Sequence, residues 1–358
     1  MSLLVFVGAQ NRSDTEIHEG GGLTVFSWDE SAADPRLLHE EAGADNPSYL
    51  AIDAGADALY AVNEVGSWLE CTVSAYSIDR ASGALTYLNK QPTRGRASCH
   101  VALLPGRRLG VANYSHEDGG PDQAVCFYTL EDDHRIGGPV SSNAHRGEDG
   151  YEPRDRSHAH CIAPTLDGKL LLVTDLGLDC VIAYDAAEPS RETQRVRLPV
   201  GHGPRHVALH AGGRFIYVLN ELAPVISILE WDGTTLRHHS DVATLASVAP
   251  DSITAGAAIH LSDDGRYLYA STRGPDCISV FAVSDEGSRL ELRQEVGSGG
   301  AWPRDFSLTP GGGHMLVANQ HSGAVAILSR DTATGLLTDT GRRFAVRTPQ
   351  CVKIIEAI

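Results

Sequence analysis

The stretch GPRHVALHAGGRFIYVLNE, residues 203–221, decides the fold of this chain. It contains two short apolar runs separated by a turn with two glycines. Short runs that are rich in Val, Ile and Tyr and bounded by turn residues are typical of β-strands, so the stretch predicts a hairpin. Polar residues open the first strand, as Pro-Arg-His, and close the second, as Asn-Glu. An antiparallel hairpin brings these two polar ends together.

The same pattern occurs five more times, with successive copies beginning 46 to 61 residues apart. The other copies are NPSYLAIDAGADALYAVNE (46–64), RASCHVALLPGRRLGVANY (96–114), SHAHCIAPTLDGKLLLVTD (157–175), AGAAIHLSDDGRYLYASTR (255–273) and WPRDFSLTPGGGHMLVANQ (302–320). All copies have the same length, so corresponding residues at their two ends keep a constant spacing. A constant register over many units is the mark of a repeat protein.

Half units stand at the two termini. TPQCVKII (348–355) looks like a first strand without its partner, and LLVFVGAQ (3–10) looks like a second strand without its first. Two further strand-like segments follow each hairpin, such as 73–79 and 85–90. Four strands per repeat of about 50 residues predict an all-β fold, a seven-bladed β-propeller of four-stranded antiparallel blades. Strands from both termini would close the ring and remove exposed sheet edges.

The prediction is one domain over residues 1–358. Its blades are expected at about 349–358 with 1–45, then 46–95, 96–156, 157–202, 203–254, 255–301 and 302–348. Two separate β-sandwich domains are the alternative, but they leave the constant register and the split unit unexplained.

In such a blade the start of the first strand and the end of the second lie on one face of the disc, so these ends should converge around one mouth of the central channel. Strand starts contribute Ser48, His100, His158, His160, Arg205, His206, Arg304 and Asp305. Strand ends contribute Asn63, Glu64, Asn113, Tyr114, Asp175, Asn220, Glu221, Arg273, Asn319 and Gln320. The recurring asparagines suit bracing of the backbone. The residues that differ between blades are the better candidates for catalysis.

The chain resembles the seven-bladed lactonase propellers, a family that includes bacterial 6-phosphogluconolactonases and fungal carboxy-cis,cis-muconate cyclases. The resemblance covers all repeats and is most specific in 157–179, 203–222 and 268–281, with His-x-His, Pro-Arg-His…Asn-Glu and Arg-Gly elements. It implies a functional set of His158 or His160 with Arg205, Glu221 and Arg273. Thr272 is a departure, because relatives commonly have Asn before Arg-Gly.

Hydrolysis of a sugar lactone, 6-phosphogluconolactonase-like, is the function we expect. His160 or Glu221 would accept a proton from water, while Arg205 and Arg273 would bind the oxyanion and a substrate anion. No Gly-x-Ser-x-Gly motif occurs, which favours direct attack by water. Neither an organic cofactor nor a metal is expected. Further substrate contacts are expected from His158, His206, Asp175, Arg304, Asn319, Gln320, Tyr114, His100 and Glu64.

Three alternatives remain open. The same residues could run a cycloisomerisation of carboxy-cis,cis-muconate. His158 and His160, two positions apart on a strand, could ligate a metal together with Asp175. A propeller can also be a non-enzymatic docking platform.

Charge and composition narrow the partners. The chain has 46 acidic and 29 basic residues, a formal net charge of −17, which argues against nucleic acid or an anionic membrane as the partner. The seven cysteines lack CxxC spacing, and no signal peptide or membrane-spanning segment is seen, so we expect a cytoplasmic protein, monomeric or homodimeric, that acts on a small molecule. Polar loops at 114–123, 141–158 and 246–256 add candidate contacts in Tyr114, His116 and Arg154.

Overall fold

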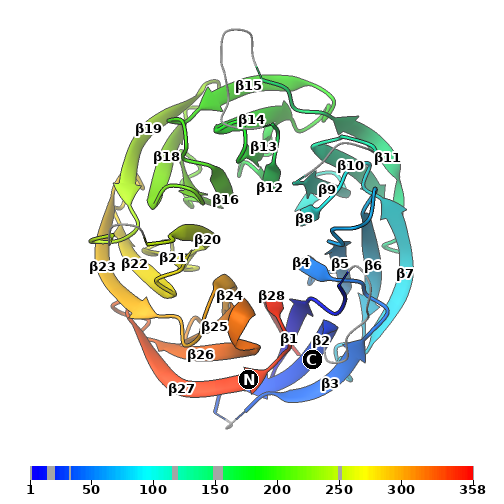
Figure 1. The fold of residues 1–358 in the computed structure, drawn as a ribbon, viewed down its shortest axis with the longest axis vertical. Coiled ribbons are helices and arrows are strands. Elements are labelled where there is room, and N and C mark those ends of the chain that lie inside the picture. The colour runs from blue at the N-terminus through cyan, green and yellow to red at the C-terminus, as the bar shows by residue number, and fades with distance from the viewer. Residues whose placement is uncertain are drawn as a thin grey trace.

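The computed structural model describes residues 2–13, 21–31, 34–114, 120–147, 156–248 and 252–357. These residues form seven four-stranded antiparallel sheets arranged in a ring around a central axis (Figure 1). The predicted all-β, seven-bladed propeller is therefore confirmed. Within the described residues, no helix is long and apolar enough to cross a membrane.

In each blade the four strands follow one another from the central axis to the outer rim (Figure 1). The first contains β28 (Pro349–Glu356), β1 (Ser2–Ala9), β2 (Gly22–Asp29) and β3 (Arg36–Glu41). The second contains β4 (Pro47–Asp53), β5 (Ala58–Asn63), β6 (Thr72–Ile78) and β7 (Leu85–Pro92). The third contains β8 (Ser98–Leu104), β9 (Arg108–Asn113), β10 (Val125–Leu130) and β11 (Ile136–Asn143). The fourth contains β12 (Ala159–Pro164), β13 (Leu170–Asp175), β14 (Cys180–Asp185) and β15 (Glu192–Arg197).

The fifth contains β16 (Pro204–Leu209), β17 (Phe215–Asn220), β18 (Val225–Trp231) and β19 (Leu236–Ala243). The sixth contains β20 (Ala255–Leu261), β21 (Tyr267–Arg273), β22 (Cys277–Val283) and β23 (Leu290–Gly297). The seventh contains β24 (Pro303–Leu308), β25 (His314–Asn319), β26 (Ala324–Arg330) and β27 (Leu337–Ala345), with a short 3-10 turn, η1 (Gln320–Ser322), after β25.

The two ends of the chain close the ring in the first blade. β28 pairs antiparallel with β1, from Leu3 opposite Glu356 to Ala9 opposite Pro349. Figure 1 shows the red C-terminal strand beside the blue N-terminal one. This is the pairing expected from the two half units.

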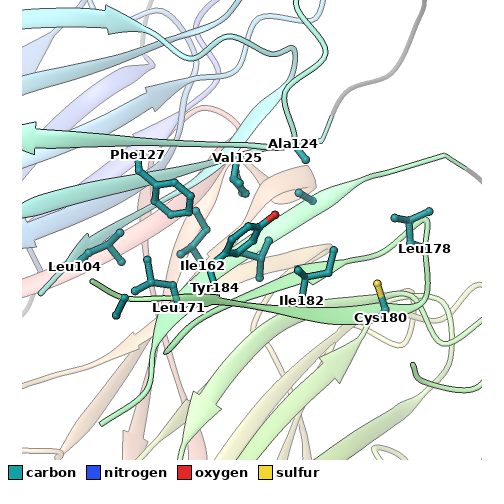
Figure 2. Packing of buried hydrophobic residues seen from close by; sticks show 14 residues of the cluster. Leu104, Ala124, Val125, Phe127, Ile162, Leu171, Leu178, Cys180, Ile182 and Tyr184 are labelled. Atoms are coloured by element: carbon teal, nitrogen blue, oxygen red, sulfur yellow. The ribbon is translucent and has the colours of Figure 1, made fainter. Parts of the chain in front are cut away.

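Hydrophobic clusters lie between neighbouring blades. The cluster in Figure 2 joins the third blade to the fourth, and the rings of Phe127 and Tyr184 meet edge to face at 5.9 Å. Strands covered on both faces are apolar along most of their length, as in the fully buried β17, where only the last residue, Asn220, has a polar amide side chain. The outermost strands alternate instead, and β23 exposes every second residue to water.

Each innermost strand carries a β-bulge or a longer register shift near its start. In β16, Pro204 pairs with Asn220 and His206 pairs with Leu219, so Arg205 is an extra, unpaired residue. A bulge of this kind turns its extra side chain away from the regular pleat. The extra residues of the single-residue bulges are Ser48, Cys99, His160, Arg205, Arg304 and Gln350. In β20 a longer shift lies between Gly256 and Ile259.

At Gly8, in the blade that closes the ring, a side chain would clash with the neighbouring blade. A Cβ placed there would lie 2.1 Å from the carbonyl oxygen of Pro47, in the neighbouring blade. We expect Gly8→Ala to lower the free energy of unfolding by about 1–3 kcal/mol, because the backbone must move to relieve the clash. Gly66→Ala is the matched control, since nothing lies within 4 Å of a Cβ there. Urea denaturation measures both, and equal stabilities would contradict the expectation.

Candidate active site

Glu221 joins two arginines at one mouth of the channel. Its Oε2 lies 2.9 Å from Nε of Arg205, and its Oε1 lies 3.0 Å from Nη2 of Arg273. Arg205 is the bulge residue of β16, Arg273 ends β21, and Glu221 directly follows β17. Burial alone would raise the pKa of Glu221, but Arg273 and Arg205 outweigh it and hold the pKa below its ordinary value. The carboxylate is therefore ionised and occupied by two cations.

Arg205 also determines which ring nitrogen of the neighbouring His206 carries the proton. Its Nη1 donates to the carbonyl oxygen of Ala257 and lies 3.2 Å from Nε2 of His206. A guanidinium can only donate, so Nε2 of His206 accepts and the proton of this ring is on Nδ1. Burial and the charge of Arg205 lower the pKa of His206 well below its ordinary value. His206 is thus neutral.

His160 is the second neutral histidine of the group. Its ring centroid lies 5.3 Å from that of His206. Burial, followed by the charges of Arg205 and Arg304, lowers its pKa well below the ordinary value. Within the described part of the chain, Nδ1 of His160 is buried and has no hydrogen-bond partner. An unpartnered buried nitrogen is costly, which marks a place where a ligand or water supplies the partner.

A second carboxylate–arginine pair joins the second blade to the seventh. Oε2 of Glu64, after β5, lies 3.4 Å from Nη2 of Arg304, the bulge residue of β24. Both side chains are partly exposed. The charge of Arg304 acts on Glu221, Arg205 and His160. Three guanidinium groups against two carboxylates leave one net positive charge here, in a protein whose formal charge is −17. We call Arg205, Arg273, Arg304, Glu64 and Glu221 the arginine cluster.

Aromatic rings pack against this cluster. Tyr49 stacks on His100 with ring centroids 4.2 Å apart and meets His206 edge to face at 5.5 Å. His100 accepts the N–H of Ile162 at Nδ1, and burial lowers its pKa to about 3. Nζ of Lys353 lies 4.5 Å from the centre of the Tyr49 ring.

Lys353 forms a buried ion pair with Asp305 beside these rings. Its Nζ lies 3.1 Å from Oδ2 of Asp305, while Nε2 of His260 lies 3.4 Å from Oδ1. Burial works against the charge on Lys353, but Asp305 raises its pKa above the ordinary value. Sequence reasoning missed Tyr49, His260 and Lys353. A signal for Lys353 existed, since it is the one lysine in the innermost strands that the structure describes.

Several residues predicted to contact substrate already form hydrogen bonds within the protein. Oδ1 of Asp175 accepts the N–H groups of His158 and Leu178, and Oδ2 accepts bonds from His145 and Ser157. These four bonds use its acceptor capacity, so Asp175 braces the fourth blade and has none left for a substrate.

The asparagines of the strand ends bond their own surroundings. Asn319 donates to the carbonyl oxygen of Ser298, and Asn113 donates to those of Thr93 and Gln123. Such contacts suit bracing and leave little of Asn319 for the substrate contact expected of it. Gln320 differs, because its Oε1 is buried and has no partner among the described residues.

His158 and Tyr114 form a unit next to His160. Nδ1 of His158 donates to the carbonyl oxygen of Tyr114 at 2.6 Å, and the two rings stack with centroids 4.4 Å apart. The ring of Tyr114 also lies 5.8 Å from that of His160. In the part of the chain that the structure describes, no group of three or more His, Cys, Asp or Glu side chains is arranged to hold a metal. His116 and Arg154 lie outside the described residues.

The buried histidines should make the fold sensitive to acid. Below pH about 6.5 the unfolded chain protonates His100, His160 and His206, whereas the folded chain, with lowered pKa values, does not. These histidines therefore do not lower the free energy of unfolding above this pH. As the pH falls below it, the free energy of unfolding decreases by about 1.4 kcal/mol per pH unit for each histidine.

Urea denaturation between pH 6.5 and 5 measures this slope. His100→Gln is expected to reduce it by about one histidine's share. His239→Gln, at an exposed position, is the control and should leave the slope unchanged. An unaltered slope in His100→Gln would mean that this ring is not the acid-sensitive group.

Comparison with known proteins agrees with this architecture. A family described as "Lactonase, 7-bladed beta-propeller" matches residues 5–354. A 6-phosphogluconolactonase of Bacillus subtilis is 30% identical over 95% of this chain and 97% of its own. A periplasmic gluconolactonase of Pseudomonas aeruginosa has a similar structure, with a TM-score of 0.88 and 27% identity over the full length of both chains. A putative 6-phosphogluconolactonase of Bacteroides fragilis superposes with a TM-score of 0.86 and 28% identity, over 99% of this chain and 98% of its own. The chain therefore belongs to the seven-bladed β-propeller lactonase family.

Proposed function

We propose that this protein hydrolyses a sugar lactone that carries a phosphate or another acidic group, in the manner of a 6-phosphogluconolactonase. The observation that carries the proposal is the arginine cluster beside a neutral, unpartnered histidine, at one mouth of an otherwise acidic protein. The names of the relatives support the same chemistry.

The two parts of the arginine cluster suit two different tasks. Arg205 and Arg273 form ion pairs with Glu221 and donate to the backbone carbonyl oxygens of Ala257, Ala255 and Gly256, so these contacts position their guanidinium groups before the substrate arrives. Preorganised donors of this kind stabilise the negative charge that develops on the carbonyl oxygen. Arg304 is bound more loosely by Glu64 and is partly exposed. It suits the substrate's phosphate or carboxylate, which guanidinium groups bind with paired hydrogen bonds.

His160 is the better candidate for the general base. Both carboxylate oxygens of Glu221 already face a guanidinium group, Oε2 that of Arg205 and Oε1 that of Arg273. His160 is neutral and has a free ring nitrogen. In the proposed reaction it takes a proton from water as the water oxygen attacks the lactone carbonyl. The tetrahedral oxyanion is held by Arg205 and Arg273. The ring C–O bond then breaks, and the proton on His160 passes to the leaving alkoxide, giving the hydroxy acid.

An assay of the purified protein on three substrates tests the proposal. We expect catalysed hydrolysis of 6-phosphoglucono-δ-lactone, slower hydrolysis of glucono-δ-lactone, and no cyclisation of carboxy-cis,cis-muconate. Each rate is compared with spontaneous hydrolysis in the same buffer. Turnover of the muconate instead would favour the cycloisomerase. No turnover of any substrate would favour a docking platform. Activity lost on treatment with a chelator and restored by a divalent metal would favour the metal hydrolase.

A further inference from the structure

A cavity of about 590 Å³ lies between the ends of the fifth and sixth blades and the start of the seventh. Its lining includes Leu245, Val248, Ile253 and Pro275, together with serine and threonine hydroxyl groups. Val248 and Ile253 are strongly exposed for apolar residues. Its volume falls in the range of small-molecule sites, and an apolar lining with a few polar groups is their usual composition.

A hydrogen-bonded backbone clasp between Asp276 and Trp302 adjoins the cavity, and Trp302 is part of the lining. Trp302 and Asp276 have φ angles of 66° and 54°, in the left-handed region that bulky residues avoid. Oδ1 of Asp276 accepts the N–H of Trp302 at 2.8 Å and that of Gly274 at 3.1 Å. A left-handed residue also precedes β4, β8, β16 and β28, at Asn46, Ala97, Gly203 and Thr348, so this conformation belongs to the repeating scaffold.

Gly274 is part of the same clasp. Its φ is 96°, and a Cβ there would lie 1.8 Å from the carbonyl oxygen of Ile253. Glycine therefore lets the two walls of the cavity come together at this point.

Trp302 connects the cavity to the arginine cluster. Cζ of Arg273 lies 5.4 Å from the centre of the Trp302 ring, a cation–π distance. The same ring stacks on His321 with centroids 4.8 Å apart and planes 16° from parallel. The indole is thus fixed by its neighbours and forms a wall that the cavity and the proposed oxyanion site share.

The charged and apolar side chains that line the cavity indicate which chemical group it can bind. Glu295 is part of the lining, and its Oε1 accepts the N–H of Ala246. A carboxylate disfavours an anion here, and the apolar side chains favour an uncharged group. We propose that this cavity binds the uncharged portion of the substrate distant from the lactone carbonyl, an alkyl or aryl substituent. The proposal rests on the function proposed above and extends it to lactones with neutral substituents.

Filling the cavity tests the proposal. Val248→Trp places an indole in it without touching the arginine cluster, and Val140→Trp, an exposed valine of β11, is the matched control. The substrates are glucono-δ-lactone and its 6-O-benzyl derivative. We expect wild type to have the lower KM for the benzyl lactone. Val248→Trp should raise that KM about tenfold, with the KM for glucono-δ-lactone within twofold of wild type. No preference for the benzyl group, or equal changes for both substrates, would overturn the proposal.

A separate experiment tests Trp302 as a residue that positions Arg273. Trp302→Leu is expected to lower kcat for both lactones, and Trp302→Phe, which keeps an aromatic face, is expected to restore most of the loss. Equal kcat in the two variants would contradict this role.

A binding measurement separates this proposal from the proposed function. Benzyl β-D-glucoside, which is not a lactone, is titrated against tryptophan fluorescence in wild type and in Val248→Trp. Saturable binding that Val248→Trp abolishes supports the cavity as a site even if no lactone is hydrolysed. Absence of binding to wild type counts against the cavity even if lactones are hydrolysed.

Discussion

Replacing His160 with asparagine is expected to lower kcat for lactone hydrolysis by about two to four orders of magnitude, the usual contribution of a general base. The ring is held at a bulge, its pKa is lowered by burial and by Arg205 and Arg304, and Nδ1 has no partner in the described structure. A neutral imidazole at neutral pH is ready to accept a proton. Asparagine keeps a polar side chain of smaller size but cannot accept a proton.

The pH dependence of the wild-type rate gives a second readout for His160. Because its pKa lies below the ordinary value, the acid limb of kcat/KM should fall well below pH 6.5, and the rate should stay constant from there to neutrality. His239→Asn, at the surface, is the control and should keep full activity. A His160→Asn variant that retains wild-type kcat while remaining folded would remove the histidine from the mechanism.

Replacing Glu221 with glutamine is the second large effect, and it should appear in both stability and activity. Arg205 is almost fully buried, and Glu221 is its ion-pair partner at 2.9 Å. Removing one partner of a buried pair leaves an uncompensated charge, so we expect a loss of about 3–5 kcal/mol in the free energy of unfolding. Arg205 and Arg273 also lose the group that aims them, so kcat/KM should fall about 100- to 1000-fold.

A double variant separates the two effects. Glu221→Gln combined with Arg205→Met removes the carboxylate and one of its two guanidinium partners, so part of the lost stability should return, while Arg273 stays without its partner. Activity should not return, because the proposed oxyanion site has lost a guanidinium group. Urea denaturation and steady-state kinetics on the single and double variants measure this. Recovery of activity together with stability would mean that Glu221 serves the fold alone.

The seven blades were predictable from the sequence because the hairpin is repeated with a constant spacing and the termini carry complementary half units. The pairing of Leu3 with Glu356 follows from that pattern. Glu221, Arg205 and Arg273 could be predicted to meet because hairpin ends of successive blades share one face, and the ion pairs of Glu221 place them together.

The bulges could not be predicted from the repeat. Each single-residue bulge adds one residue at the same place, so the spacing stays constant and the shift in pairing leaves no trace in it. Trp302 could not be identified from the sequence for another reason. Only the assembled structure brings its ring against the guanidinium group of Arg273 and onto His321. Tyr49 resembles an ordinary strand residue, and only the assembled ring brings it onto His100.

The bulges also bear on how such a scaffold changes over evolutionary time. A residue inserted between two paired positions takes no part in the cross-strand ladder, so exchanging it leaves the pairing of the blade intact. In this chain the inserted positions hold Ser, Cys, His, Arg and Gln, and the residues on either side of each one stay paired with the next strand. Single substitutions there can therefore give the ring a new reactivity while its architecture is inherited unchanged.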